Sequence, residues 1–310
     1  MVSYTPPRVL FNRHLETIYP SLLRKVNWIA PSHERIGTHD DDFLDLDWYK
    51  QGSTRCVIIS HGLEGNSSRS YVRGMARALY NSGLDVLAWN FRGCSAEVNR
   101  QPRFYHSGAT DDLHTVVAHA MERYAVIDLI GFSLGGNLTL KYLGERTAPS
   151  PVKRAVTFSV PMDLYTSCLE ISKPFNWVYT QRFLKSLIKK VKAKPALRKH
   201  LSFDMLDHVR TLLEFDDHFT GPLHGFRDAM DYYTQCSSRQ FLPAINVPTL
   251  VVNALNDPFL SPACYPHENV NPLVQLEFPE RGGHVGFALF GQKGLYWSEM
   301  RALSFLESTA

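Results

Sequence analysis

Serine, aspartate and histidine occur in that order at three points of the chain that each follow an apolar stretch: Ser133, Asp257 and His284. Ser133 is the centre of the pattern G-x-S-x-G at residues 131–135, directly after the apolar run at 125–130. A serine hydroxyl becomes an effective nucleophile when an imidazole accepts its proton, and a carboxylate orients that imidazole. The three residue types therefore predict acyl transfer through an acyl-enzyme on Ser133.

Such chemistry also needs N–H donors for the negative charge that develops on the carbonyl oxygen. We expect one from the backbone of Leu134, which follows the nucleophile at the start of a helix. The second is expected from the backbone of Leu63, in the glycine-containing loop after residues 56–60. His61 in that loop is interpreted as a residue that positions backbone, and Asp163 remains an alternative to Asp257 as the acid.

Strands and helices must bring these residues together at one edge of a sheet. Apolar patterns predict strands at residues 43–49, 56–60, 84–90, 125–130, 155–160, 247–254 and 274–278, and helices at 71–80, 111–123 and 295–306. Thr110 is expected to cap the second of these helices, and the acids of the first strand are expected to face solvent. Strands that alternate with helices predict a mostly parallel, doubly wound sheet whose site lies at the carboxyl ends of the strands. Residues 1–35 carry no strong signal and are expected to wrap the outside of the core.

The alternation stops between residues 165 and 240, where the pattern is helical. We therefore predict a core of residues 1–164 and 241–310, with a helical cap of residues 165–240 inserted between core strands. A helix at 177–192 is expected to place its apolar side over an acyl pocket. The apolar positions are Trp177, Val178, Phe183, Leu184, Leu187, Ile188 and Val191.

The other side of this helix carries Arg182, Lys185, Lys189, Lys190 and Lys192, which are expected to face solvent. Two interpretations stay open. The cap is a lid with solvated lysines, or it also makes peripheral contact with an anionic membrane surface.

Composition excludes several classes. A net charge of +3 gives no support to nucleic-acid binding, and the basic run at 182–194 lacks stacking aromatics. The five cysteines are scattered without a CxxC pair, which disfavours disulfides and zinc and suits the cytoplasm. Asp216, Asp217 and His218 are interpreted as a solvated loop rather than a metal site. No cofactor, metal or obligate protein partner is expected.

Several segments together resemble the YheT-like α/β-hydrolases, bacterial relatives of the ABHD-type lipases and esterases and of the plant Emb-type hydrolases. They are HLETIYPSLLR, HGLEGNSSRSYVRGMA, WNFRGCSAEVNR, YHSGATDDL, GFSLGGNLTLKYLGE, FDDHFTGPLHGF, YYTQCSSRQFLP, NALNDPF and GGHVGF. The resemblance implies the α/β-hydrolase fold, serine carboxylic-ester hydrolysis, and the triad of Ser133, Asp257 and His284. His106 and Asp111 match an H-x-x-x-x-D pattern linked in such relatives to acyl transfer, and we interpret them as structural here.

The sequence as a whole predicts a serine carboxylic-ester hydrolase that acts on a mainly apolar acyl ester, a small molecule or lipid. The alternatives are a thioesterase or acyltransferase that uses the same triad. A different class is a catalytically silent fold that binds a hydrophobic ligand, which the presence of all three triad residues disfavours.

Overall fold

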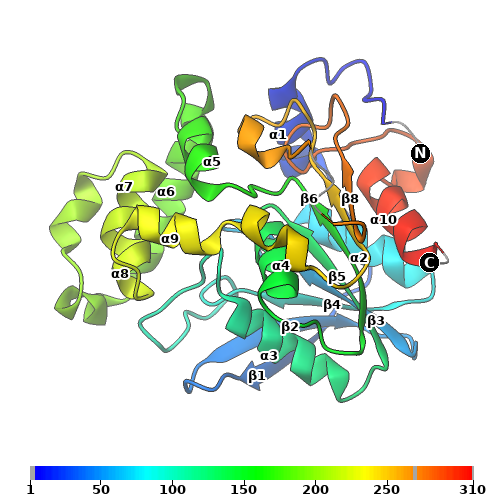
Figure 1. Ribbon diagram of the computed structural model, residues 1–310, viewed down its shortest axis with the longest axis horizontal. Helices are drawn as coiled ribbons and strands as arrows, with labels where there is room; N and C mark the ends of the chain where they lie inside the picture. Colours follow the sequence, from blue (N-terminus) through cyan, green and yellow to red (C-terminus); the bar gives the residue numbers. More distant parts are fainter. Residues whose placement is uncertain (1–3, 268–270, 309–310) are drawn as a thin grey trace.

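The computed structural model describes residues 4–267 and 271–308, and one eight-stranded sheet runs through it (Figure 1). The order in space is β1-β2-β4-β3-β5-β6-β7-β8. β1 pairs with β2, and β2 with β4, in antiparallel fashion, and all other neighbours are parallel. The strands are β1 Ser32–Gly37, β2 Phe43–Tyr49, β3 Arg55–Ser60, β4 Asp85–Asn90, β5 Val126–Phe132, β6 Val152–Phe158, β7 Thr249–Val252 and β8 Val274–Glu277.

Helices cover both faces of the sheet, and others continue beyond it. The helices are α1 Arg13–Leu23, α2 Ser70–Asn81, α3 Thr110–Met121, α4 Leu134–Glu145, α5 Leu164–Ile171, α6 Trp177–Lys192, α7 Leu212–Phe215, α8 Gly221–Leu223, α9 Ala229–Cys236 and α10 Trp297–Glu307. Side chains of α3 and α4 pack on one face, and side chains of α2 and α10 pack on the other. This arrangement is the expected α/β-hydrolase fold, with helices on both sides of a mostly parallel sheet.

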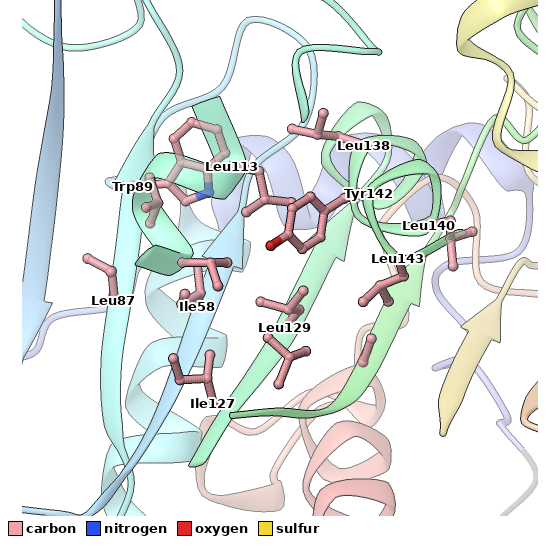
Figure 2. Close-up of a cluster of buried hydrophobic side chains, with 14 of the residues drawn as sticks. Ile58, Leu87, Trp89, Leu113, Ile127, Leu129, Leu138, Leu140, Tyr142 and Leu143 are labelled. Atoms are coloured by element: carbon pink, nitrogen blue, oxygen red, sulfur yellow. The ribbon is translucent and has the colours of Figure 1, made fainter. Parts of the chain in front are cut away.

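The alternation of side chains along each strand produces two apolar layers. Figure 2 shows Ile58, Leu87 and Leu129 from neighbouring strands facing Tyr142 and Leu143 of α4. The residues between these strand positions point the opposite way, to α2 and α10. Because successive strand residues face opposite sides, a strand buried on both faces reads as a continuous apolar run.

Helices α5 to α9 follow β6 and precede β7, and they gather at one side of the molecule, on the left in Figure 1. Their buried side chains form an apolar cluster of their own, to which Phe104 and Phe259 of the flanking loops also belong. The division into a core and a cap of residues 165–240 stays a prediction.

Three local expectations were wrong. β1 begins inside residues 1–35, which carry no strong signal and were expected only to wrap the core, because the mostly polar sequence SHERIG gives this edge strand no apolar pattern. Asp47 of β2 is buried and accepts hydrogen bonds from Ser67 and His33, whereas its acids were expected to face solvent. Thr110 does not cap α3, because its hydroxyl donates to Glu145 instead.

Candidate active site

Ser133 lies in a sharp turn between β5 and α4. Its backbone angles, φ 53° and ψ −119°, belong to a region that non-glycine residues rarely adopt. Glycine is required on both sides of Ser133 because neighbouring backbone atoms lie where a Cβ atom would be. A Cβ atom at Gly131 would collide with the carbonyl of Gly135, and one at Gly135 would collide with the carbonyls of Ser60 and His61. The turn thus holds the hydroxyl of Ser133 at the carboxyl edge of the sheet, beside the N-terminus of α4.

His284 and Asp257 reach Ser133 from the loops after β8 and β7. His284 Nε2 lies 2.9 Å from Ser133 Oγ, and His284 Nδ1 lies 2.9 Å and 3.1 Å from the two oxygens of Asp257. The carboxylate only accepts, so the proton of Nδ1 points to Asp257 and Nε2 is left to accept from the serine hydroxyl. The side chain of Asp257 is 0% exposed and that of His284 is 11% exposed. The structure therefore brings the three residues together in a hydrogen-bonded row.

Asp163, the alternative acid, has a different role. It is the N-cap of α5, and its Oδ1 accepts from the backbone N–H and the hydroxyl of Thr166. Its carboxylate has no hydrogen bond to His284, whose ring bonds to Asp257 and Ser133.

Two residues expected to supply oxyanion donors lie beside Ser133. Leu63 and Leu134 both line the cavity beside it, and in the described residues their N–H groups donate to no protein acceptor. His61 fixes the loop after β3, which carries Leu63. Its Nε2 accepts from the N–H of Phe91, so its Nδ1 carries the proton and donates to the carbonyl of Gly62 at 2.8 Å. Burial lowers the pKa of His61 to about 3, which keeps the imidazole neutral.

Helix α1 supports the histidine loop, which sequence reasoning missed. The hydroxyl oxygen of Thr17 accepts from the N–H of His284 at 2.9 Å. The carboxylate of Glu16, with 0% of its side chain exposed, accepts from the N–H of Gly282 and the amide of Asn256, and it pairs with Arg281. The only signal in the sequence was the segment HLETIYPSLLR, noted for its resemblance and assigned no chemistry. Helix α1, which lies in the segment 1–35, therefore does more than wrap the outside of the core.

A cavity of about 130 Å³, open to solvent on one side, adjoins Ser133 and His284. Its walls come from the core loops and from the helices between β6 and β7. Most of the lining is apolar, including Leu164 and Ile171 of α5 and Phe183 and Leu187 of α6. Polar side chains, among them His106 and Asp216, interrupt that lining.

His106 and Asp111 are not brought together. His106 lines the cavity, its Nδ1 accepts from the N–H of Gly108, and its ring packs against that of His224. Burial lowers the pKa of His106 well below the ordinary value of histidine. Asp111 instead pairs with Arg103 near the surface.

The orientation of α6 differs from our expectation at both ends. Trp177 and Val178, expected over the pocket, are 62% and 65% exposed because they precede the part of the helix that the core covers. Lys190, expected in solvent, is largely buried. Its Nζ lies 2.6 Å from Glu64 and 3.0 Å from the sulfur of Cys94. Lys185 and Lys189 are exposed as expected.

Asp216, Asp217 and His218 do not form a solvated loop throughout. Asp217 is exposed, but Asp216 begins a π-helical turn, Asp216–Thr220, and lines the cavity. Within residues 4–267 and 271–308, no three His, Cys, Asp or Glu side chains are grouped so that they could hold a metal ion. The five cysteines are buried and unpaired.

Comparison with known proteins agrees with the fold. The α/β hydrolase fold family matches residues 55–289. The chain therefore belongs to the α/β-hydrolase family and is a hydrolase of the esterase and lipase class. Within that family it is YheT-like. It is 37% identical to YheT of Escherichia coli (strain K12), named as a candidate esterase, over 92% of this chain and 86% of that protein.

A second relative is the phospholipase ABHD3 of Bos taurus, which is 32% identical over 82% of this chain. The match spans 66% of that protein's length. Among solved structures, an esterase of Pyrococcus furiosus superposes with a TM-score of 0.60 at 20% identity, over 92% of this chain and 95% of the other. This last likeness concerns the fold alone.

In the part of the chain that the structure describes, no helix combines the length and the apolar character that crossing a membrane requires.

Proposed function

We propose that the protein hydrolyses carboxylic esters through a covalent acyl-enzyme on Ser133. The observation that carries the proposal is the hydrogen-bonded row from Ser133 through His284 to Asp257, with distances of 2.9 Å on both sides of the imidazole. His284 accepts the hydroxyl proton as Ser133 Oγ attacks the ester carbonyl carbon. Asp257 holds the imidazole in the tautomer that can accept and stabilises the imidazolium that results.

The tetrahedral intermediate places its oxyanion between the backbone N–H groups of Leu63 and Leu134. Both groups are free of protein acceptors within the described part of the chain, so they are available to an oxygen at that point. The intermediate collapses as His284 returns the proton to the leaving alcohol. Water, activated by the same imidazole, then attacks the acyl carbonyl and releases the acid and Ser133.

The cavity supports a substrate with an extended, mainly apolar acyl group. Phe183 and Leu187 of α6 and Leu164 and Ile171 of α5 offer apolar surface next to the nucleophile. A lid formed by α5 and α6 excludes bulk water from the acyl-enzyme while the leaving group departs. The relatives named as esterases and phospholipases support the same class of substrate.

The direct test is a series of p-nitrophenyl esters from acetate to palmitate, assayed beside acyl-CoA thioesters with the parent protein and with Ser133→Ala. We expect turnover of medium or longer acyl esters that Ser133→Ala lowers by several orders of magnitude. Preference for the thioesters would make the protein a thioesterase, and unaltered turnover by Ser133→Ala would exclude the proposed nucleophile.

We further propose that the exposed part of α6 meets anionic lipid surfaces. Phe175, in the turn just before α6, and Trp177, at its start, are 78% and 62% exposed. The cations Arg182, Lys185 and Lys189 are exposed further along the same helix. Exposed aromatic and cationic side chains on one segment suit an interface that is apolar inside and negatively charged outside. Binding to anionic vesicles should weaken with salt and in the double variant Lys185→Gln, Lys189→Gln. Binding that is indifferent to both would leave the helix as a lid only.

A further inference from the structure

The cavity beside Ser133 contains a carboxylate that ester hydrolysis does not use. Asp216 lines the same cavity as Ser133 and His284, at the start of the π-helical turn Asp216–Thr220 between α7 and α8. Turns of this type are rare and occur frequently at functional sites.

The hydrogen bonds of Asp216 leave acceptor positions open. The hydroxyl of Tyr233 donates to Oδ2 at 2.6 Å, and the hydroxyl of Thr220 donates to Oδ1 at 2.6 Å. A carboxylate oxygen can accept two hydrogen bonds, so each oxygen retains one position for another donor. In the described residues, no Lys, Arg or His forms an ion pair with Asp216.

Among the described residues, no lysine or arginine lines the cavity around Asp216. Tyr105, His106 and His284 share that cavity, and burial keeps His106 neutral by lowering its pKa well below the ordinary value. The titratable side chains that interact directly with Asp216 are Cys168 of α5 and Tyr232 and Tyr233 of α9. Burial raises the pKa of Cys168 to about 12 and raises the pKa of both tyrosines well above their ordinary value, so all three stay uncharged near neutrality. The side of α6 that faces the cavity presents Phe183 and Leu187.

Burial raises the pKa of Asp216 itself to about 6, so above that pH the pocket holds a negative charge without a protein cation. An ionised group without a partner in an apolar environment costs free energy, which a ligand with a donor would recover. The hydroxyls of Tyr233 and Thr220 hold the carboxylate in place for such a ligand. They stabilise its charge without using up its acceptor capacity.

We propose that Asp216 binds a hydrogen-bond donor, an ammonium or a hydroxyl group, on the part of the substrate remote from the ester carbonyl. The inference rests on the ester hydrolysis proposed above and names its substrate class: esters whose chain ends in such a donor. An ammonium group is the better ligand, because it supplies charge as well as a donor.

The test compares chains of equal length that differ in the terminal group: the methyl esters of nonanoic, ω-hydroxyoctanoic and ω-aminooctanoic acids. We expect kcat/KM to be about tenfold or more higher for the ammonium ester than for nonanoate, with the hydroxy ester between them. A second pair, ω-aminooctyl acetate and nonyl acetate, shows whether the donor belongs to the alcohol instead. Equal rates within both sets would overturn the proposal.

Two matched variants assign the preference. Asp216→Asn should bring the ratio of kcat/KM for the ammonium ester to kcat/KM for methyl nonanoate close to one. Asp217→Asn, at the exposed neighbour, should leave this ratio as it is.

The pH dependence of the parent protein provides a test that needs no variant. Because Asp216 is charged above a pH of about 6, the ammonium preference should be complete above that pH and decline below it, while the substrate amine stays protonated throughout. A ratio that Asp216→Asn retains, or that is constant from about pH 5 to 8, would contradict the role of Asp216.

A binding measurement separates this inference from the proposed reaction. Hexylammonium cannot be hydrolysed, so its effect does not depend on Ser133. It should raise the Tm of the parent protein and of Ser133→Ala, and not that of Asp216→Asn. Such a Tm shift without ester turnover would reject the proposed hydrolysis and support the donor site at Asp216. Turnover of plain esters without a Tm shift would support the hydrolysis and reject the donor site.

Discussion

At the scale of single residues, two aspartates were candidates for the acid, and the structure gives them different partners. Asp257 bonds to His284, whereas Asp163 caps α5. Asp257→Asn should lower kcat by about three to four orders of magnitude, because an amide can donate to Nδ1 and favour the wrong tautomer. Asp163→Asn is the matched control and should keep activity within a few-fold, since asparagine also caps helices. The reverse pattern in steady-state kinetics would move the acid to Asp163.

Thr17 provides a second test at this scale. Thr17→Val keeps the shape of the side chain and removes the acceptor for the N–H of His284. We expect kcat to fall about tenfold with KM little changed, because a small displacement of the imidazole affects the reaction more than binding. Thr17→Ser restores the oxygen and should restore kcat. If Thr17→Val and Thr17→Ser had the same kcat, Thr17 would have a packing role only.

The residues that the sequence predicted and those that it did not differ in one respect. Ser133, Asp257 and His284 each follow a recognisable strand, so their positions at one edge follow from local patterns, although their catalytic roles stay predictions. Thr17 and Asp216 have no such local sign. Thr17 meets His284 across 267 positions of the chain, and Asp216 enters the cavity through an irregular turn.

At the scale of elements, the clearest feature is the connection between α6 and the loop after β3. Lys190 and Ser186 of α6 both bond to Glu64, the residue after Leu63, and Tyr105 donates to the same carboxylate. Glu64 has a positive φ of 52°, which these contacts help to maintain. The position of α6 is thereby linked to the loop that carries the Leu63 N–H.

Lys190→Met tests that link. Removing one partner of a largely buried ion pair leaves the other charge uncompensated, so the free energy of unfolding should fall by about 3 kcal/mol. We also expect a lower kcat, because the Leu63 N–H loses its support. Lys189→Met, at the exposed neighbour, should change neither quantity in denaturant titrations and ester assays. Loss of stability without loss of kcat would separate the ion pair from the oxyanion loop.

The extent of α6 was predictable, and its orientation was not. Apolar spacing and Pro174 and Pro195 bounded the helix, and the structure has it at Trp177–Lys192. Which residues of its polar side reach the core depends on a carboxylate from a distant loop, which no helical pattern contains. β1 was missed for a related reason, because pairing with β2 rather than its own sequence makes it a strand.

At the scale of the whole molecule, buried neutral histidines make stability depend on pH. Burial lowers the pKa of His61 to about 3 and lowers those of His106 and His224. The unfolded chain binds protons at these histidines below a pH of about 6.5 and the folded chain does not, so stability is lost as the pH falls through this window. One such group accounts for about 2 kcal/mol between pH 6.5 and 5.

Urea unfolding at pH 7 and pH 5 checks this expectation. The parent protein should lose more stability over this interval than His61→Gln, by about 2 kcal/mol, even if the variant starts from a lower value. The difference between the two changes in the free energy of unfolding does not contain the contribution of the carboxylates, because they titrate equally in both proteins. Identical changes would mean that His61 is not a buried neutral histidine.

The central claim is that Ser133 is the nucleophile, and a covalent probe tests it most directly. An alkyl fluorophosphonate should add one phosphonyl group to the parent protein, and peptide mass spectrometry should locate it on Ser133. His284→Ala should react far more slowly, because the imidazole that accepts the hydroxyl proton is gone. Labelling at another residue, or equal labelling of Ser133→Ala, would contradict the account.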